Sequence, residues 1–230
     1  EVQDIADFVG DSLELSLCAV QTQAKIIVFC GVSFMAETAA ILNPDKKVLM
    51  PDENALCPMA GMLPAELVRF YRREYPDAKI VLYINTLAEA KAYCDAVCTS
   101  ANSAEIIDRM DSETVLFGPD LNLAQYAMNF TKKRVVPIPA YAFCPVHKLL
   151  VSDAKKFIVA TEIGLLHRMK EERKDAVFIP AYDEAVCVNM KLHTLEKVYL
   201  SLRHERYPVK VPPKIMTLAR NSVEFMLKTR

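Results

Sequence analysis

Three cysteines that occur in similar sequence surroundings could carry out chemistry together. Cys57, Cys144 and Cys187 each follow an apolar run that ends in proline and then a loop of a few residues. None of them belongs to a CxxC pair, so neither a disulfide nor a zinc site closed by paired cysteines is indicated. Three thiolates that meet at one point could instead hold a [4Fe–4S] cluster and leave one iron open as a Lewis acid.

The same three cysteines also have an ordinary interpretation. An unpaired cysteine is most often a small buried apolar residue, and the repeated loop context weighs against this role without excluding it. The other four cysteines fit a core role better: Cys30 ends a predicted strand, Cys94 lies on a predicted helix, Cys98 lies in a strand, and Cys18 lies on the opening helix.

The elements that must position these cysteines alternate between short apolar runs and amphipathic stretches. Eight runs are nearly all apolar, as strands buried on both faces of a parallel sheet are. They span 25–31, 46–51, 79–85, 95–100, 114–119, 134–139, 157–162 and 176–181. Helices are predicted over 64–75, 87–94, 103–110, 164–173, 193–203 and 212–230. This alternation predicts an α/β fold with parallel sheets.

The three cysteine-bearing loops predict three similar Rossmann-like αβα units. Loops after the C-terminal ends of parallel strands are where α/β folds build their sites, so three such loops could converge on one point. We predict a first unit over 1–57, which the helix 212–230 joins, a second over 58–144, and a third, incomplete unit over 145–211.

The composition limits the classes of function. The 230 residues are 52% hydrophobic and 25% charged, with a net charge of −1 and seven cysteines. No basic surface for nucleic acid or membranes is indicated, and no apolar run approaches the roughly 18 residues of a membrane-spanning helix. We therefore expect no nucleic-acid partner, no membrane association, and a cytoplasmic location that keeps the cysteines reduced.

Many stretches of the chain resemble quinolinate synthase. They include "GDSLELS" at 10–16, "FMAET" at 34–38, "ALCPMAGM" at 55–62, "VLYIN" at 81–85, "FCPVHKL" at 143–149 and "EAVCVNMKLHTLEKV" at 184–198. The resemblance implies a [4Fe–4S] enzyme of NAD biosynthesis that condenses iminoaspartate with dihydroxyacetone phosphate to quinolinate. It also implies three α/β domains around a pseudo-threefold axis.

The resemblance also implies roles for individual residues. It makes Cys57, Cys144 and Cys187 the ligands of the cluster, and Tyr83 and His147 catalytic. The implied substrate-binding residues are Ser12, Tyr83, Asn85 and Ser100. Without the resemblance, the two serines would be interpreted as helix N-caps, and His147 as a hydrogen-bonded structural residue. Met35 and Glu37 match as well, and we expect them to pack beside or support the site.

The chain departs from the family pattern at two places. The family has an upstream strand with an active-site His and Tyr, and we expect that the true N-terminus precedes Glu1. The family also has a His-Pro-Glu-Cys stretch and a later Gly-Ser-Thr after the Cys-Pro-Val-His motif. Here that motif runs directly into 152–162, so we expect a break close to Val151 and Ser152. A protein without both stretches should hold the cluster and not catalyse.

Two classes of function follow from the sequence. The first is the cluster enzyme, with iminoaspartate and dihydroxyacetone phosphate as small-molecule substrates and an iminoaspartate-producing enzyme as an expected partner. The alternative is a non-catalytic α/β module that binds a phosphorylated metabolite, with cysteines that hold structural zinc or nothing. Iron and sulfide content separates the two.

Overall fold

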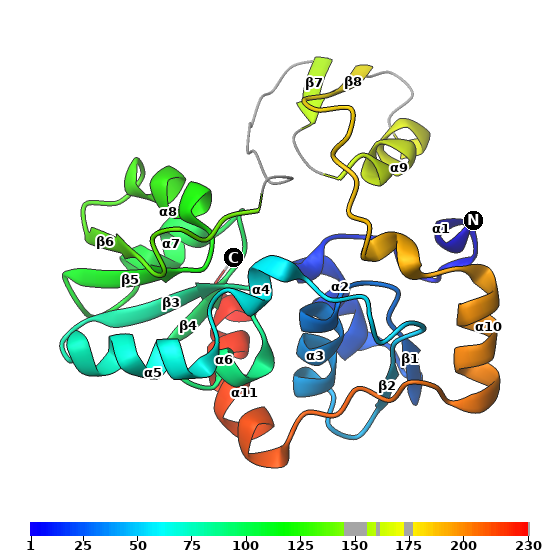
Figure 1. Cartoon of the computed structure of the whole chain (residues 1–230), viewed down its shortest axis with the longest axis horizontal. Helices are drawn as coiled ribbons and strands as arrows, with labels where there is room; N and C mark the ends of the chain where they lie inside the picture. Colours follow the sequence, from blue (N-terminus) through cyan, green and yellow to red (C-terminus); the bar gives the residue numbers. More distant parts are fainter. Residues whose placement is uncertain (145–155, 160–161, 173–176, 230) are drawn as a thin grey trace. The chain divides into compact units, whose positions relative to one another are not determined.

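A computed structural model of the chain describes residues 1–144, 156–159, 162–172 and 177–229 (Figure 1). The chain forms two compact units. The first unit comprises Glu1–Ala142 and Asn189–Arg230, and the second comprises Phe143–Val188. The α/β class with parallel sheets is confirmed in both. The arrangement of three units around a pseudo-threefold axis, with the boundaries given above, stays a prediction.

The larger sheet of the first unit has four parallel strands. Their order is β4 (Ala96–Cys98), β3 (Lys79–Tyr83), β5 (Thr114–Gly118) and β6 (Arg134–Pro137). Figure 1 shows α5 and α6 on one side of this sheet and α7 and α8 on the other. The two covered faces explain why the strand sequences are almost continuously apolar.

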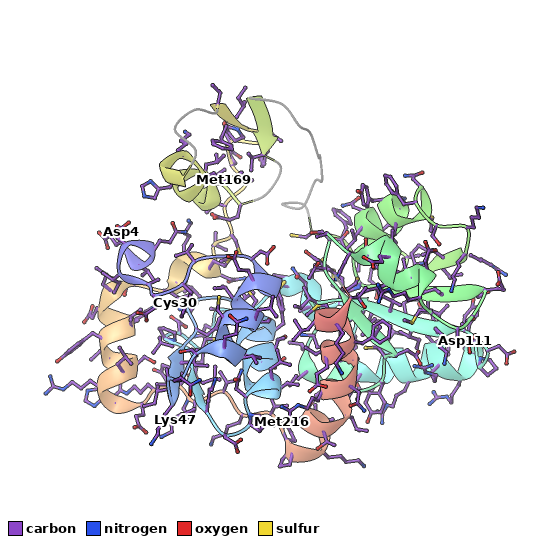
Figure 2. The ribbon with its side chains drawn as sticks, turned by 180° about the vertical axis from the view of Figure 1, so that it is seen from behind. Asp4, Cys30, Lys47, Asp111, Met169 and Met216 are labelled. Atoms are coloured by element: carbon purple, nitrogen blue, oxygen red, sulfur yellow. The ribbon has the colours of Figure 1, made fainter. Side chains whose placement is uncertain are left out.

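The smaller sheet of the first unit pairs β1 (Ile26–Val28) with β2 (Lys47–Leu49) in parallel, with Ile27 opposite Val48. Lys47, the first residue of β2, is labelled in Figure 2, which shows the molecule from the opposite side to Figure 1. All six strands of the first unit therefore form where the sequence predicts them.

The helices of the first unit connect and cover the two sheets. They are α1 (Val2–Ile5), α2 (Ser12–Gln21), α3 (Ser33–Leu42), α4 (Pro58–Gly61), α5 (Ala65–Glu74), α6 (Ala88–Lys91), α7 (Ser103–Asp108), α8 (Leu121–Met128), the 3₁₀ turn η1 (Met190–Leu192), α10 (Leu195–His204) and α11 (Pro213–Lys228). The C-terminal helix α11 packs on α3 beside the smaller sheet and on β4 and α6 of the larger one. Helix α11 therefore connects the parts of the first unit that contain the two sheets.

Two details of the prediction are wrong. Cys94 does not lie on a helix, because α6 ends at Lys91 and the chain turns there: the backbone N–H of Tyr93 donates to Ala90. Cys30 does not end a strand, because β1 ends at Val28, two residues earlier. Both differences concern element ends, where hydrogen bonds to other parts of the fold decide the boundary.

The described residues of the second unit form one parallel pair of strands and one helix. These are β7 (Lys156–Val159), β8 (Val177–Pro180) and α9 (Gly164–Glu172), each within its predicted range or one residue outside it. Val159, Leu166 and Phe178 form its small core, against which Met169, labelled in Figure 2, packs. Across the described residues of both units, no helix has the length and apolar character needed to span a membrane.

Candidate functional site

The loop that carries Cys57 is tied to its surroundings by backbone hydrogen bonds. It follows β2, and Asp52 turns the chain by accepting from the backbone N–H of Asn54 at 2.9 Å. Ala55 is fully buried, and its carbonyl accepts from the N–H of Ser33, the first residue of α3, at 2.9 Å. Cys57 then adopts an extended conformation directly before Pro58 of α4. The thiol is therefore half-buried and belongs to no disulfide.

The loop before Cys144 is built in the same way. It follows β6, the neighbour of β5 in the larger sheet. Ala142 is fully buried, and its carbonyl accepts from Leu121, the first residue of α8, at 2.8 Å. The N–H of Ala142 donates to Pro139, three residues earlier, at 3.3 Å, as the N–H of Ala55 does to Asp52.

The loop before Cys187 repeats this pattern inside the second unit. Ala185 is buried, its carbonyl accepts from Ile163 at the start of α9 at 2.9 Å, and its N–H donates to Tyr182 at 3.1 Å. Each of the three cysteines therefore follows a βαβ motif, two residues after a buried alanine whose carbonyl is tied to the start of the crossover helix. In the sequence the three loops read Ala-x-Cys, at 55–57, 142–144 and 185–187, but 92–94 and 96–98 read the same, so the tripeptide alone does not identify the loops.

The structure keeps the three cysteines in loops of the predicted kind, and their convergence stays a prediction. Cys57 belongs to the first unit, and Cys144 and Cys187 belong to the second. Within the described part of each unit, no group of three or more His, Cys, Asp or Glu side chains could hold a metal ion. His147 lies outside the described residues.

Tyr83 and Asn85 lie at the end of β3, as predicted, and both are buried. The N–H of Ile84 donates to the carbonyl of Cys98 at 2.8 Å, which continues the pairing of β3 with β4 past the end of the strand. The Thr86 hydroxyl donates to the Tyr83 carbonyl at 2.6 Å and closes the turn. The backbone that presents both side chains is therefore fixed.

Glu37 and Lys91 hold the same turn against α3. The Glu37 carboxylate accepts from the N–H of Ala88, the first residue of α6, at 2.7 Å. Lys91, the last residue of α6, is fully buried, and its ammonium donates to the Thr38 hydroxyl at 2.8 Å and to the Phe34 carbonyl at 3.4 Å. Burial raises the pKa of Glu37 and lowers the pKa of Lys91 to about 8. These contacts fix α6 and the turn before it against α3, and the supporting role of Glu37 at a site stays a prediction.

Lys91→Met is expected to remove a rise in stability between pH 8 and 10.5. The pKa of Lys91 is lowered from 10.5 to about 8. In this window the unfolded chain binds more protons than the folded one, so wild-type stability increases with pH, by about 3 kcal/mol over the whole window. Urea unfolding of both proteins at several pH values measures the difference between them. If the free energy of unfolding of the two proteins changed with pH in parallel, the lowered pKa of Lys91 would be contradicted.

The structure excludes N-capping as the role of the two predicted serines. The Asp11 carboxylate, rather than Ser12, accepts from the N–H of Glu14 at 2.8 Å and caps α2. Ser100 lies in the turn between β4 and α7, before the cap residue Asn102. Both serines are half-buried. Their hydroxyls thus lie at a helix start and at a strand end, where a substrate group could be bound.

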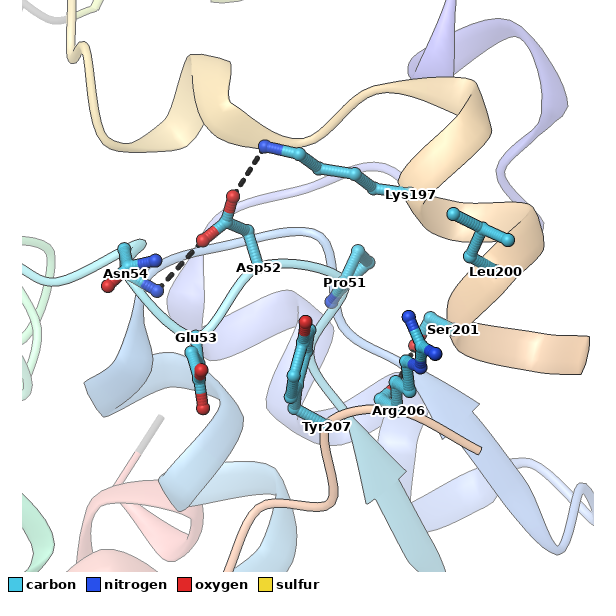
Figure 3. Close-up of a pocket in the computed structure, with 9 residues that line it drawn as sticks. All are labelled: Pro51, Asp52, Glu53, Asn54, Lys197, Leu200, Ser201, Arg206 and Tyr207. Carbon is cyan, nitrogen blue, oxygen red and sulfur yellow. Dashed lines mark hydrogen bonds and ion pairs between the residues drawn. The ribbon is translucent and has the colours of Figure 1, made fainter. Parts of the chain in front are cut away.

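Asp52, Lys197 and His193 are functional candidates that the sequence analysis missed. A pocket of about 120 Å³ lies beside the loop that leads to Cys57, and Figure 3 shows Lys197 of α10 directed at the Asp52 carboxylate on its wall. The remaining lining residues are Pro51, Glu53, Asn54, Leu200, Ser201, Arg206 and Tyr207. Both His193 and Lys197 lie in the matching stretch 184–198, which was the signal that could have identified them.

Comparison with known proteins finds relatives along nearly the whole chain. Residues 1–155 and 150–228 match the family model described as "Quinolinate synthetase A protein". A quinolinate synthase from Methanothermobacter thermautotrophicus is 46% identical over 274 residues, which cover 99% of this chain and 90% of that protein. Those from Thermococcus onnurineus (99% and 90% covered) and Thermotoga maritima (97% and 89%) are 41% and 40% identical.

The comparison with the Methanothermobacter protein spans more positions than this chain has residues. Its 274 positions exceed the 230 residues by 44, so at least 44 positions of the relative have no counterpart here. The two family matches meet at 150–155. The predicted break near Val151 and Ser152 falls at the same place, which lies outside the described residues.

We predict that the native protein carries additional residues at this junction. Trypsin would release residues 149–155 as one peptide, because Lys148 precedes it and Lys155 ends it. Mass spectrometry of the digested native protein should find no such peptide and should find in its place tryptic peptides whose sequences do not occur in the 230 residues. Detection of peptide 149–155 in good yield would contradict the predicted break.

Proposed function

Because the chain belongs to the quinolinate synthetase A family, we propose that it condenses iminoaspartate with dihydroxyacetone phosphate to form quinolinate. The relatives that match 97–99% of the chain carry the name quinolinate synthase. The structural observation that carries the proposal is the threefold repeat of a βαβ motif with a tied Ala-x-Cys loop. A non-catalytic binding module is not favoured, since such a module gives no reason for three cysteine loops with the same backbone hydrogen bonds.

The donor set fits a [4Fe–4S] cluster held by three thiolates. Cys57, Cys144 and Cys187 are half-buried, belong to no disulfide, and follow backbone that is fixed by hydrogen bonds. They would hold three irons, and the cluster would supply a Lewis acid through the fourth. Cys30, Cys94 and Cys98 are poor ligands, because the thiolate is the ligand form and burial raises the pKa of each thiol, to about 11 for Cys30 and about 12 for Cys94.

The proposed roles of the other residues follow from their chemistry. The Tyr83 hydroxyl is proposed to orient substrate and transfer a proton, with His147 as the second proposed catalytic residue. The Asn85 amide can bind a carboxylate through its N–H₂ group. The hydroxyls of Ser12 and Ser100 are proposed to bind phosphate or carboxylate oxygens. An iminoaspartate-producing enzyme is the proposed partner, and the cytoplasm, where thiols stay reduced, is the proposed location.

Metal analysis of anaerobically purified protein tests this proposal against its alternative. We expect about four iron and four sulfide per chain, with broad visible absorption. A colourless protein with one zinc per chain would support the binding module and contradict the cluster enzyme.

A further inference from the structure

An ion pair links the loop that leads to Cys57 with helix α10. Lys197 Nζ lies 2.5 Å from Asp52 Oδ2 and donates to the Leu192 carbonyl at 2.9 Å (Figure 3). The other carboxylate oxygen, Oδ1, accepts from the backbone N–H of Asn54. The Asp52 side chain is only 11% exposed, and the hydrogen bond from Lys197 lowers its pKa. The pair is therefore a charge-assisted hydrogen bond that is partly shielded from solvent, and such bonds are strong because the local dielectric constant is low.

His193 makes a second link, from the same segment to the loop after β1. Its Nε2 lies 2.8 Å from the Gly31 carbonyl. A carbonyl only accepts, so the ring proton is assigned to Nε2 and Nδ1 is left as an acceptor. Nδ1 is buried and has no partner among the described residues, which makes the contact costly for stability. Because the contact costs stability, we interpret His193 as a residue that positions the segment around it rather than one that stabilises the fold.

We propose that Asp52, Lys197 and His193 are positioning residues for the iron–sulfur cluster. They hold the loop that leads to Cys57 and the segment Asn189–Lys197, which begins two residues after Cys187, in one arrangement before metal binds. The inference rests on the proposed function.

The separation of the two ligands along the chain explains the need for such contacts. Cys57 and Cys187 are 130 residues apart, so the chain between them does not fix one relative to the other. Without the contacts, both loops would lose conformational entropy when metal binds, and this loss would weaken metal binding. Partners of this kind, one step removed from the ligands, commonly change metal affinity 10–100-fold.

Asp52→Asn is the most selective test. Asparagine keeps the oxygen that accepts from Asn54 and replaces the oxygen that accepts from Lys197 with an N–H₂ group, so the turn stays and the ion pair is lost. We expect iron to pass to a chelator about tenfold faster than from wild type, with a changed EPR spectrum of the reduced cluster. Lys197→Met should have the same effect, the double variant should add little, and Lys197→Arg should behave like wild type.

Glu205→Gln is the matched control. Its carboxylate pairs with Lys47, so the control also removes an ion pair between β2 and the end of α10. This pair is exposed and lies at the first residue of β2, whereas the Cys57 loop follows the last. We expect the control to release iron at the wild-type rate. If Asp52→Asn fails to fold, His193→Gln takes its place with the same expectation.

The results separate this inference from the proposed function. Wild-type protein that takes up no iron overturns both. Wild-type protein with a full complement of iron, together with Asp52→Asn and Lys197→Met variants that release iron at the wild-type rate, overturns the positioning role alone. Equally fast iron release from Glu205→Gln would also overturn the positioning role, because the faster release would then reflect lower stability of the whole protein.

Discussion

Cys57→Ser is expected to abolish quinolinate synthesis and to remove most of the bound iron. Serine has nearly the same size, so the buried Ala55 and the backbone bonds of the loop should persist. Serine lacks the thiolate that binds iron. The loss of iron affinity should therefore exceed the roughly 100-fold loss that follows removal of a residue that only contacts a ligand. Iron and sulfide analysis, the visible spectrum and the quinolinate assay measure the three consequences on one preparation.

The other two proposed ligands and two controls complete this test. Cys144→Ser and Cys187→Ser should behave like Cys57→Ser. Cys94→Ser should keep its iron and activity, because burial keeps the Cys94 thiol protonated and its Sγ already donates to the Lys91 carbonyl at 3.3 Å. Full iron in any of the first three variants, or equal loss in Cys94→Ser, would contradict the assignment of the ligands.

Tyr83→Phe is expected to lower turnover by about 100-fold while the cluster stays intact. The ring is buried at the end of β3, and the turn behind it is closed by Thr86, so phenylalanine can take the same place. Only the hydroxyl is lost, and a positioned proton-transfer group commonly contributes at least that factor. The effect should appear in kcat with iron content unchanged.

Tyr126→Phe on α8 is the control for this variant. Tyr126 packs against Phe130, with 4.8 Å between the ring centroids, and lies in the last turn of α8, which ends at Met128. Its turnover should equal that of wild type. Equal turnover in Tyr83→Phe and Tyr126→Phe would reduce Tyr83 to a packing role.

The sequence was sufficient to predict β3, β4 and β5 because nearly all of their residues are buried. β3 reads Lys-Ile-Val-Leu-Tyr, and its last four residues are all buried. A pattern of this kind depends only on neighbouring residues and on the two covered faces of the sheet. The end of α6 could not be predicted in the same way. The Lys91 carbonyl accepts from Ser222, which lies 131 residues later in α11.

The candidate site was predicted in part for the same reason. Tyr83 ends a strand, Cys57 and Asn85 lie in segments that follow strands, and strand ends can be located from local sequence. The contacts of Asp52 with Lys197 and of Gly31 with His193 span 145 and 162 residues. No local pattern encodes such pairs, and only the fold brings them together.

The most direct test of the central claim is an anaerobic assay of the complete gene product with iminoaspartate and dihydroxyacetone phosphate. Protein with about four iron per chain should form quinolinate, should require both substrates, and should lose the activity when the cluster is removed. The same iron-loaded protein forming no quinolinate from the two substrates would contradict the proposed function.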